Sequence, residues 1–205
     1  MSEKIIELVK EARGNSKERK FSQSFDIIVN LKLMDTKKPE NRLNEIVTLP
    51  KGRGRDAKIV IFSDTLKGDD YTTVGSDGIS SLASDKRKMK RLTADVDFFM
   101  ADPKLMVAIG KSLGKVLAPR GKMPTLITGE PGPMINRFKK SVRVKVKDSP
   151  VVQCLVGIEG MSDEDVASNV KFILNFLEKK LPKGRNNIGK AMLKLTMGKP
   201  VKVEI

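Results

Sequence analysis

The sequence predicts an α/β protein built from two parts that differ in their pattern of apolar residues. Near both ends of the chain apolar and polar residues alternate, which is typical of strands with one buried face. In the middle, short runs of consecutive apolar residues alternate with a helical pattern, which is typical of strands that helices cover on both faces. Residues 50–56, a basic connector punctuated by glycines, mark the boundary between the N-terminal segment and the middle of the chain.

The first part is expected to hold one helix and two strands. Apolar residues recur at helical spacing over residues 2–13. Apolar residues recur at every second position over residues 25–33 and predict a strand over residues 24–33, and residues 45–49 predict a second one after a polar turn at residues 35–42. The side chains expected on the buried face of the first strand are Phe25, Ile27, Val29, Leu31 and Leu33.

The middle part is expected to contain buried strands at residues 58–62 and 97–101. A helical pattern follows over residues 103–117, with Pro103 at its first position. Residues 141–147 alternate valine with a cation, which predicts a strand with one buried face and one basic face.

The last quarter of the chain returns to the alternating style. Residues 151–158 predict a strand, and Ser162 is placed to cap a long amphipathic helix whose first turn is acidic. Residues 191–196 and 200–205 predict a final strand pair around the turn that contains Met197 and Gly198.

The chain is strongly basic, with 40 Lys and Arg against 25 Asp and Glu, a net charge of +15, and 39% hydrophobic residues. A cation placed beside a phosphate displaces a condensed counterion, so a folded binder of polyanions is expected. The alternative is a soluble protein that carries excess lysine for solubility. The net charge is +4 in residues 1–56 (13 minus 9), +8 in 57–150 (18 minus 10) and +3 in 151–205 (9 minus 6). Charge alone therefore favours the middle segment as the polyanion site.

The composition excludes several kinds of chemistry. The chain has no histidine and a single cysteine, Cys154, so Ser–His–Asp catalysis, the usual zinc sites and an internal disulfide are excluded. Cys154 lies in the apolar run 151–156 and is interpreted as a core residue. The chain shows neither a signal-peptide pattern nor a run of about 18 apolar residues, so a soluble intracellular protein without a membrane partner is expected.

Two apparent nucleotide motifs fail on their context. Residues 52–57 match G-x-G-x-x-A, but a strand pattern follows where a helix is needed to bind pyrophosphate. Gly110-Lys-Ser112 lacks the earlier glycine of a phosphate loop and falls inside a helical pattern. The carboxylate pairs Asp69-Asp70 and Asp95/Asp97 are interpreted as solvated charges.

Basic clusters and the scarcity of aromatic residues favour structured RNA over single strands. With eight Phe, one Tyr and no Trp, the chain lacks a row of stacking aromatics. The turn at Met197 and Gly198 offers a backbone that could approach a ribose or base closely, although an ordinary hairpin turn has the same pattern. The clusters are Lys51/Arg53/Arg55, residues 86–91, Arg137/Lys139/Lys140 and Lys179/Lys180/Lys183/Arg185.

Four separated motifs, in this order, carry a resemblance to a known family. They are Lys20-Phe-Ser-Gln-Ser-Phe25, Leu49-Pro-Lys-Gly-Arg-Gly54, Pro119-Arg-Gly-Lys-Met-Pro124 and Leu195-Thr-Met-Gly198. Over nearly its full length the chain resembles the L-one family of large ribosomal subunit proteins in its archaeal form. The resemblance implies a discontinuous RNA-binding α+β domain, residues 1–54 and 150–205, and an inserted Rossmann-like α/β domain, residues 55–149.

The resemblance also implies a function and a site. A member of this family is expected to be cytoplasmic and on the ribosome, monomeric when free, with neither cofactor nor metal. It would bind 23S-type rRNA of the stalk, assist release of deacylated tRNA at the exit site, and repress translation of its own mRNA. The RNA-binding residues implied are Glu11, Lys20, Phe21, Ser24, Thr196, Met197 and Gly198. The hinge or interdomain residues implied are Gly52, Gly54, Pro119, Arg120, Gly121, Met123 and Pro124.

Two alternative functions remain open at this point. One is a free-standing translational repressor that acts on mRNA through the same residues. The other is an α/β enzyme that binds a phosphorylated small molecule through Arg120 and Lys122, for which a paired acid and base in a pocket would be needed.

Overall fold

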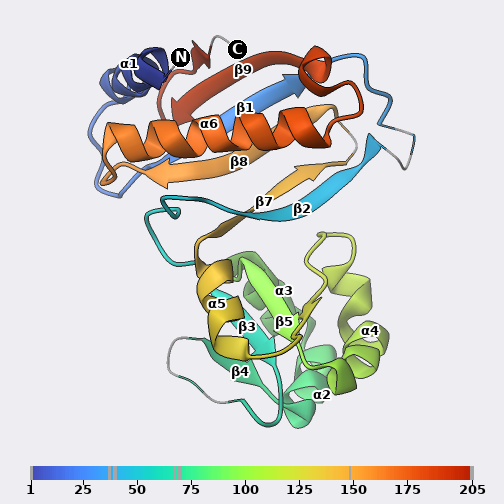
Figure 1. The fold of residues 1–205 in the computed structure, drawn as a ribbon. Coiled ribbons are helices and arrows are strands. Elements are labelled where there is room, and N and C mark those ends of the chain that lie inside the picture. Colours follow the sequence, from blue (N-terminus) through green and yellow to red (C-terminus); the bar gives the residue numbers. More distant parts are fainter. Residues whose placement is uncertain are drawn as a thin grey trace. The chain divides into compact units, whose positions relative to one another are not determined.

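The computed structural model describes residues 2–36, 38, 41–66, 68, 71–147 and 149–203 (Figure 1). Asp69-Asp70, parts of the predicted turn at 35–42 and the end of the predicted last strand lie outside the described residues. The chain divides into two compact units, residues 1–55 with 140–205 and residues 56–139. We call them the terminal unit and the inserted unit.

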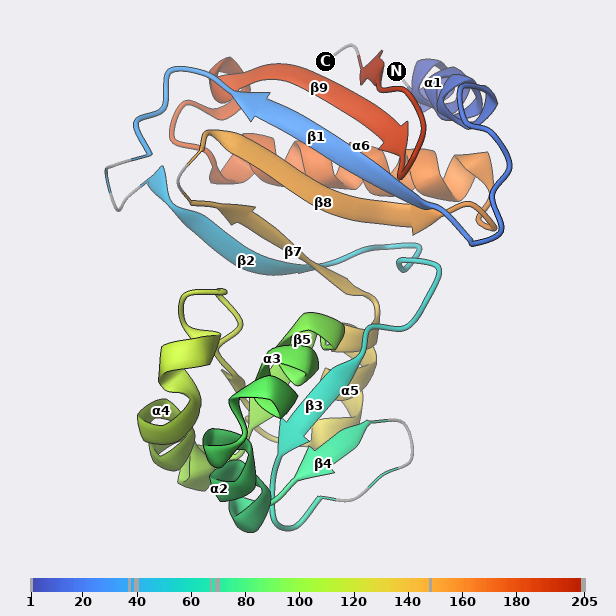
Figure 2. The ribbon, with the colours of Figure 1, turned by 180° about the vertical axis from the view of Figure 1, so that it is seen from behind.

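The terminal unit is built on a four-stranded antiparallel sheet in the order β10-β9-β1-β8. The predicted strands at residues 24–33, 151–158, 191–196 and 200–205 all belong to it. Both of the unit's long helices pack into one core with it, and seen from behind the strands lie in front of α6 (Figure 2). The bounds are α1 (Ser2–Gly14), β1 (Ser24–Leu31), β8 (Val151–Ile158), α6 (Asp163–Lys180), β9 (Ile188–Leu195) and β10 (Val201–Val203).

Alternation along β1 explains how this core forms. Phe25, Ile27 and Val29 are fully buried, as their predicted inward phase requires. They lie opposite Leu195, Leu193 and Ala191 of β9, so residues far apart in sequence complete one apolar layer under the helices. The first helix also contacts the last strand, β10, so the two ends of the described chain lie side by side.

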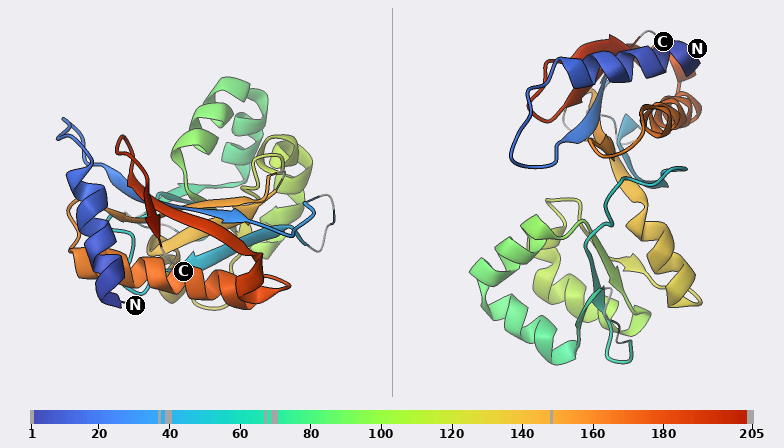
Figure 3. Two further views of the ribbon diagram at one scale, coloured as in Figure 1. Left: turned by 90° about the horizontal axis from the view of Figure 1, so that it is seen from above. Right: turned by 90° about the vertical axis from the view of Figure 1, so that its left-hand side faces the viewer.

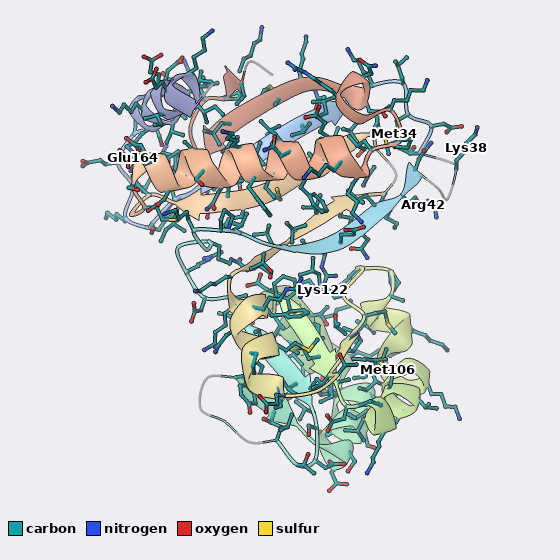
Figure 4. All side chains as sticks on the ribbon, in the orientation of Figure 1. Met34, Lys38, Arg42, Met106, Lys122 and Glu164 are labelled. Carbon is teal, nitrogen blue, oxygen red and sulfur yellow. The ribbon has the colours of Figure 1, made fainter. Side chains whose placement is uncertain are left out.

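The predicted caps form as expected on α6. The Ser162 hydroxyl accepts a hydrogen bond from the backbone N–H of Asp165 at 3.2 Å. Acidic residues, including the exposed Glu164 (Figure 4), occupy the first turn, and Lys179 and Lys180 occupy the last. Both distributions oppose the helix dipole and stabilise the helix.

A second pair of strands corrects the predicted domain boundary. β2 (Leu43–Thr48) pairs antiparallel with β7 (Ser141–Val146), and β7 also lies against β8. The valines of β7 are buried with Val47 in the core of the terminal unit. The predicted boundary at 149/150 is therefore wrong, because it assigns β7 to the inserted segment, whereas the unit boundary falls at 139/140.

This boundary also changes where the charge lies. The terminal unit carries 26 basic and 15 acidic residues, a net charge of +11, and the inserted unit carries 14 and 10, a net charge of +4. The cations at positions 140, 143, 145 and 147 account for much of the difference. The expectation that charge favours the middle segment is therefore wrong for the folded units.

The inserted unit is a parallel sheet in the order β4-β3-β5-β6 with helices on both faces (Figure 3, right). Phe98 and Phe99 of β5 point to opposite faces: Phe98 packs edge-on against Phe138 of α5, and Phe99 stacks near Phe62 in the core under α2, α3 and α4. The bounds are β3 (Ile59–Phe62), β4 (Thr72–Val74), α2 (Ser76–Ser84), α3 (Lys86–Asp95), β5 (Phe98–Ala101), α4 (Pro103–Leu117), β6 (Thr125–Leu126) and α5 (Pro131–Lys139).

One residue of the predicted first strand, Leu33, faces solvent and not the core. Leu33 was expected to be buried, but it is 70% exposed. The strand ends at Leu31, because the next backbone N–H, of Lys32, bonds to the carbonyl of Asn187 instead of continuing the sheet. Leu33 then adopts a left-handed conformation with φ of 57° and turns its side chain outward.

The predicted hinge residues fall into two groups. Gly52 and Gly54 precede the first crossing between units, at 55/56, and both have left-handed φ values, 69° and 83°. Residues 119–124 form a turn after α4 in the inserted unit, well before the second crossing at 139/140, so they are not a connection between the units. Lys122 (Figure 4) instead donates from Nζ to the carbonyls of Thr93 and Val96 at 2.7 and 2.6 Å.

The boundary yields a first prediction. A spliced protein of residues 1–55 and 140–205 should fold cooperatively, because it keeps β2 with β7 and one complete core. A splice of residues 1–54 with 150–205 should be less stable by about 2–5 kcal/mol, because it removes the three buried valines of β7 from the core and uncovers Val47 of β2. Urea unfolding of both proteins checks this, and equal midpoints would contradict the boundary at 139/140.

Candidate nucleic-acid interface

Two segments from opposite ends of the chain meet where β1 begins and β9 ends. The backbone N–H of Ser24 donates to the Thr196 hydroxyl at 3.1 Å, and the N–H of Thr196 donates to the carbonyl of Ser24 at 3.0 Å. The Thr196 hydroxyl also donates to the Ser24 carbonyl, at 3.3 Å. The structure thus brings together two predicted site residues that are 172 positions apart.

A buried amide, which the predicted site did not include, holds this junction. Gln23 is fully buried, and its Oε1 accepts hydrogen bonds from the hydroxyl of Ser16 at 3.1 Å and from the N–H of Met197 at 3.3 Å. Its Nε2 donates to the carbonyl of Lys17 at 3.2 Å, and its backbone N–H donates to Oε2 of Glu159 at 3.1 Å. A signal for it was present in the sequence, since Gln23 is in phase with the inward residues of β1.

Around this junction lie exposed apolar side chains. Phe21 is 53% exposed and Met197 is 59% exposed, although both belong to types that are usually buried. Lys20 and Phe21 line an open pocket together with Glu18, Arg19, Ser22, Glu159 and Gly160. An exposed ring and an exposed thioether on adjoining turns can stack on a flat ligand such as a base.

The last two predicted residues occupy different surroundings. Gly198 packs inward, because a Cβ at this position would lie 3.3 Å from Cβ of Ser16 and 3.4 Å from Cβ of Leu195. Its small size therefore allows the turn to approach the chain after α1, a packing role that the sequence analysis did not assign to it. Glu11 is exposed on α1, and its carbonyl accepts from the N–H of Asn15 at the end of that helix.

Arg13 ties the first helix to this end of the sheet. Its guanidinium donates to Oδ1 of Asp163 at 2.8 Å and to the carbonyls of Glu159 and Met161. It also lies over the ring of Phe25, 5.3 Å from the centroid. These contacts fix the segment after β8 against α1, so the surface around the predicted residues is a rigid platform.

Comparison with known proteins decides the family. The sequence model of the Ribosomal protein L1p/L10e family matches residues 9–199. The chain belongs to this family. It is similar to the large ribosomal subunit protein uL1 of Methanothermococcus thermolithotrophicus, with 42% identity covering 98% of both chains. It is also similar to the uL1 proteins of Pyrococcus horikoshii (42%, covering 98% of this chain and 96% of the relative) and Methanobrevibacter smithii (40%, 99% and 100%).

The enzyme alternative loses support from both the family and the geometry. The relatives of this family are named as ribosomal proteins and not as enzymes. The Lys122 ammonium, proposed above to hold a phosphate, bonds the carbonyls at the end of α3.

Within the described residues no three carboxylate or cysteine side chains are grouped to hold a metal. No described helix combines the length and apolar composition that crossing a bilayer requires.

Cys154 gives a second prediction. It is buried as expected, and burial, reinforced by the nearby Asp26 carboxylate, raises the pKa of its thiol from 9.0 to about 12. Because the thiolate is the reactive form, the folded protein should react with Ellman's reagent at pH 8 roughly 1000-fold more slowly than the unfolded chain. Absorbance at 412 nm with and without guanidinium chloride measures this, and equal rates would contradict the buried placement.

The third prediction concerns Gln23. Gln23→Met keeps the approximate shape but leaves the partners of the amide without bonds, so the free energy of unfolding should fall by about 1–3 kcal/mol. Gln153→Met, at an exposed position of β8, is the matched control and should change it by less than about 0.5 kcal/mol. Hydrogen exchange should also speed up at the N–H of Met197, because this N–H donates a hydrogen bond to Oε1 of Gln23. Equal stability of the two variants would exclude Gln23 as the residue that holds the junction.

Proposed function

We propose that the chain is a constituent of the large ribosomal subunit and binds 23S-type stalk rRNA through the terminal unit. The observation that carries this proposal is the rigid junction of residues 16–24 and 195–198, which presents Phe21 and Met197 to solvent on a unit of charge +11. The names of the similar archaeal proteins support it.

The chemistry of the junction suits structured RNA. Exposed Lys17, Arg19 and Lys20 lie in the first of these segments and exposed Lys199 directly follows the second, so all four can contact phosphates, which supplies affinity without sequence selectivity. Selectivity then has to come from Phe21 and Met197 stacking on unpaired bases and from hydroxyls that can bond ribose 2′-OH groups. The rigid support beneath these residues lowers the entropy that binding has to overcome.

We further propose the finer functions that the family resemblance implies. On the ribosome the chain would assist release of deacylated tRNA at the exit site. As a free monomer in the cytoplasm it would bind a similar structure in its own mRNA and repress translation. One surface serves rRNA and mRNA in this proposal, so the two RNAs should compete, and excess rRNA should relieve repression.

The fourth prediction tests the surface. Met197→Ala and Phe21→Ala should each weaken binding to a stalk rRNA fragment about 5- to 50-fold, or about 1–2 kcal/mol, because a stacking partner is lost. The matched control is Leu33→Ala, since Leu33 is also an exposed apolar residue, at 70%, and belongs to the same unit. It should leave the affinity within about twofold.

The measurement is filter binding or fluorescence anisotropy at constant salt, with circular dichroism to show that each variant is folded. The same proteins should be tested for sedimentation with large ribosomal subunits. An unchanged affinity in both Met197→Ala and Phe21→Ala would reject the junction as the RNA site. Absence of the wild-type chain from the subunit fraction would reject the ribosomal assignment and leave the mRNA repressor.

A further inference from the structure

The charge of the inserted unit is concentrated in one region. Residues 85–122, which hold α3, α4 and the turn after it, carry ten cations and four acidic residues, a net charge of +6. The rest of this unit carries four cations and six acidic residues, a net charge of −2. The unit is therefore polarised, which excess lysine spread for solubility would not produce.

Within this region, α3 breaks the rules that stabilise an isolated helix. Its first turn holds Lys86, Arg87 and Lys88 and no acidic residue, although the helix dipole places positive charge there. Lys90 and Arg91 follow at the i+3 and i+4 spacings where like charges repel. Asp95 stands in the last turn, where a cation would be favourable.

Contacts from outside α3 compensate these unfavourable charges. The Asp85 carboxylate accepts from the N–H groups of Arg87 and Lys88 at 2.9 and 3.0 Å, which caps the first turn. Lys122 bonds the carbonyls of Thr93 and Val96 at the other end. The helix is thus held in place without help from its own cations.

The five cations of α3 remain available to a ligand. All five side chains are exposed, and within the described part of the chain none of them forms an ion pair or a hydrogen bond. Arg120 adds a sixth cation beside them, because its guanidinium donates to the carbonyl of Lys90 at 3.4 Å. A local arrangement that costs stability and leaves charge unpaired is expected at functional sites.

We infer that α3, together with Arg120, is a second RNA-binding surface that takes the phosphate backbone of an RNA helix. This rests on the proposed function, in which the terminal unit binds structured RNA. The apolar residue Met89 and the residue Thr93 face the core, so α3 lacks the outward apolar face of a membrane-binding helix. It also has no aromatic residue for stacking on single strands. Contact through phosphates alone supplies affinity without sequence selectivity.

The test is a variant of the full chain in which three cations of α3 are replaced by uncharged residues, Arg87→Gln with Lys90→Gln and Arg91→Gln. The matched control removes the same charge from the neighbouring helix: Lys104→Gln with Lys111→Gln and Lys115→Gln. The stability of the α3 variant should not fall, since like-charge repulsion is relieved and Asp85 and Lys122 keep their backbone partners. Affinity is measured against salt for a stalk rRNA fragment and for an unrelated RNA duplex.

In the α3 variant, the log–log slope of affinity against salt should become shallower by roughly two units for both RNAs. The ratio of wild-type to variant affinity should then be about 100-fold larger at 0.1 M salt than at 1 M salt. The preference of the variant for stalk RNA should stay unchanged. The control should change the slope by less than one unit. Met197→Ala should show the opposite pattern, with the preference reduced and the slope kept, so failures of the two proposals are distinguishable.

Equal slopes for the α3 variant and wild type would overturn the inference. Equal changes of the salt slope in the α3 and α4 variants would also overturn it, because the net charge of the unit would then matter and not the place of the charges on α3. Loss of binding to phosphatidylserine vesicles, with RNA slopes unchanged, would assign a membrane surface in place of RNA.

Discussion

The terminal unit depends on the requirement that a buried amide must have all of its hydrogen bonds. Gln23 lies where burial would cost about 1–3 kcal/mol per unpaired group. Its partners come from the segment after α1, the turn after β9 and the segment after β8. The side chain and the backbone N–H of this one residue therefore fix three segments at once, and the surface they share inherits that rigidity.

Topology, and not composition, decides where the charge of this protein acts. Counting along the sequence assigns most of the positive charge to the middle of the chain. Pairing of β7 with β2 returns four nearby cations to the terminal unit and raises its net charge to +11. The electrostatic argument and the family resemblance then point to the same unit, whereas the sequence alone set them against each other.

The parts of the fold that follow local rules could be predicted. The apolar residues at every second position of β1, the Ser162 cap of α6 and Pro103 at the start of α4 each predicted an element that the structure contains. α3 was not predicted as a helix: residues 86–91 were noted as a basic cluster, and with just Met89 and Thr93 buried the segment has little apolar periodicity. The β2–β7 pairing depends on contacts between residues about 100 positions apart, which no local pattern reports. The prediction that Leu33 is buried was wrong, because the hydrogen bond from the N–H of Lys32 to the carbonyl of Asn187 ends the strand early.

The same division holds for the candidate site. The motifs predicted Phe21, Ser24, Thr196 and Met197, and the structure joins the segments that carry them through hydrogen bonds at Ser24 and Gln23. Gln23 and Arg13 were missed, because their importance lies in partners that are 136 and 150 positions away. Gly198 was selected for the backbone it leaves bare, and the structure adds a packing role, since its missing side chain makes room for Ser16. A motif can thus identify a residue before its physical role is known.

Placing the junction between the two ends of the chain has a consequence for when it can form. β1 needs β9 beside it, and the Met197 N–H needs the amide of Gln23, so residues 16–24 cannot adopt their arrangement until residue 198 has been made. The inserted unit closes its own parallel sheet from residues 56–139 and does not wait for the chain end. During synthesis, a surface on α3 could therefore attract phosphates before the selective surface exists. Selective recognition, in contrast, is tied to a finished terminal unit, so an incomplete chain could hold RNA through charge without discriminating between RNAs.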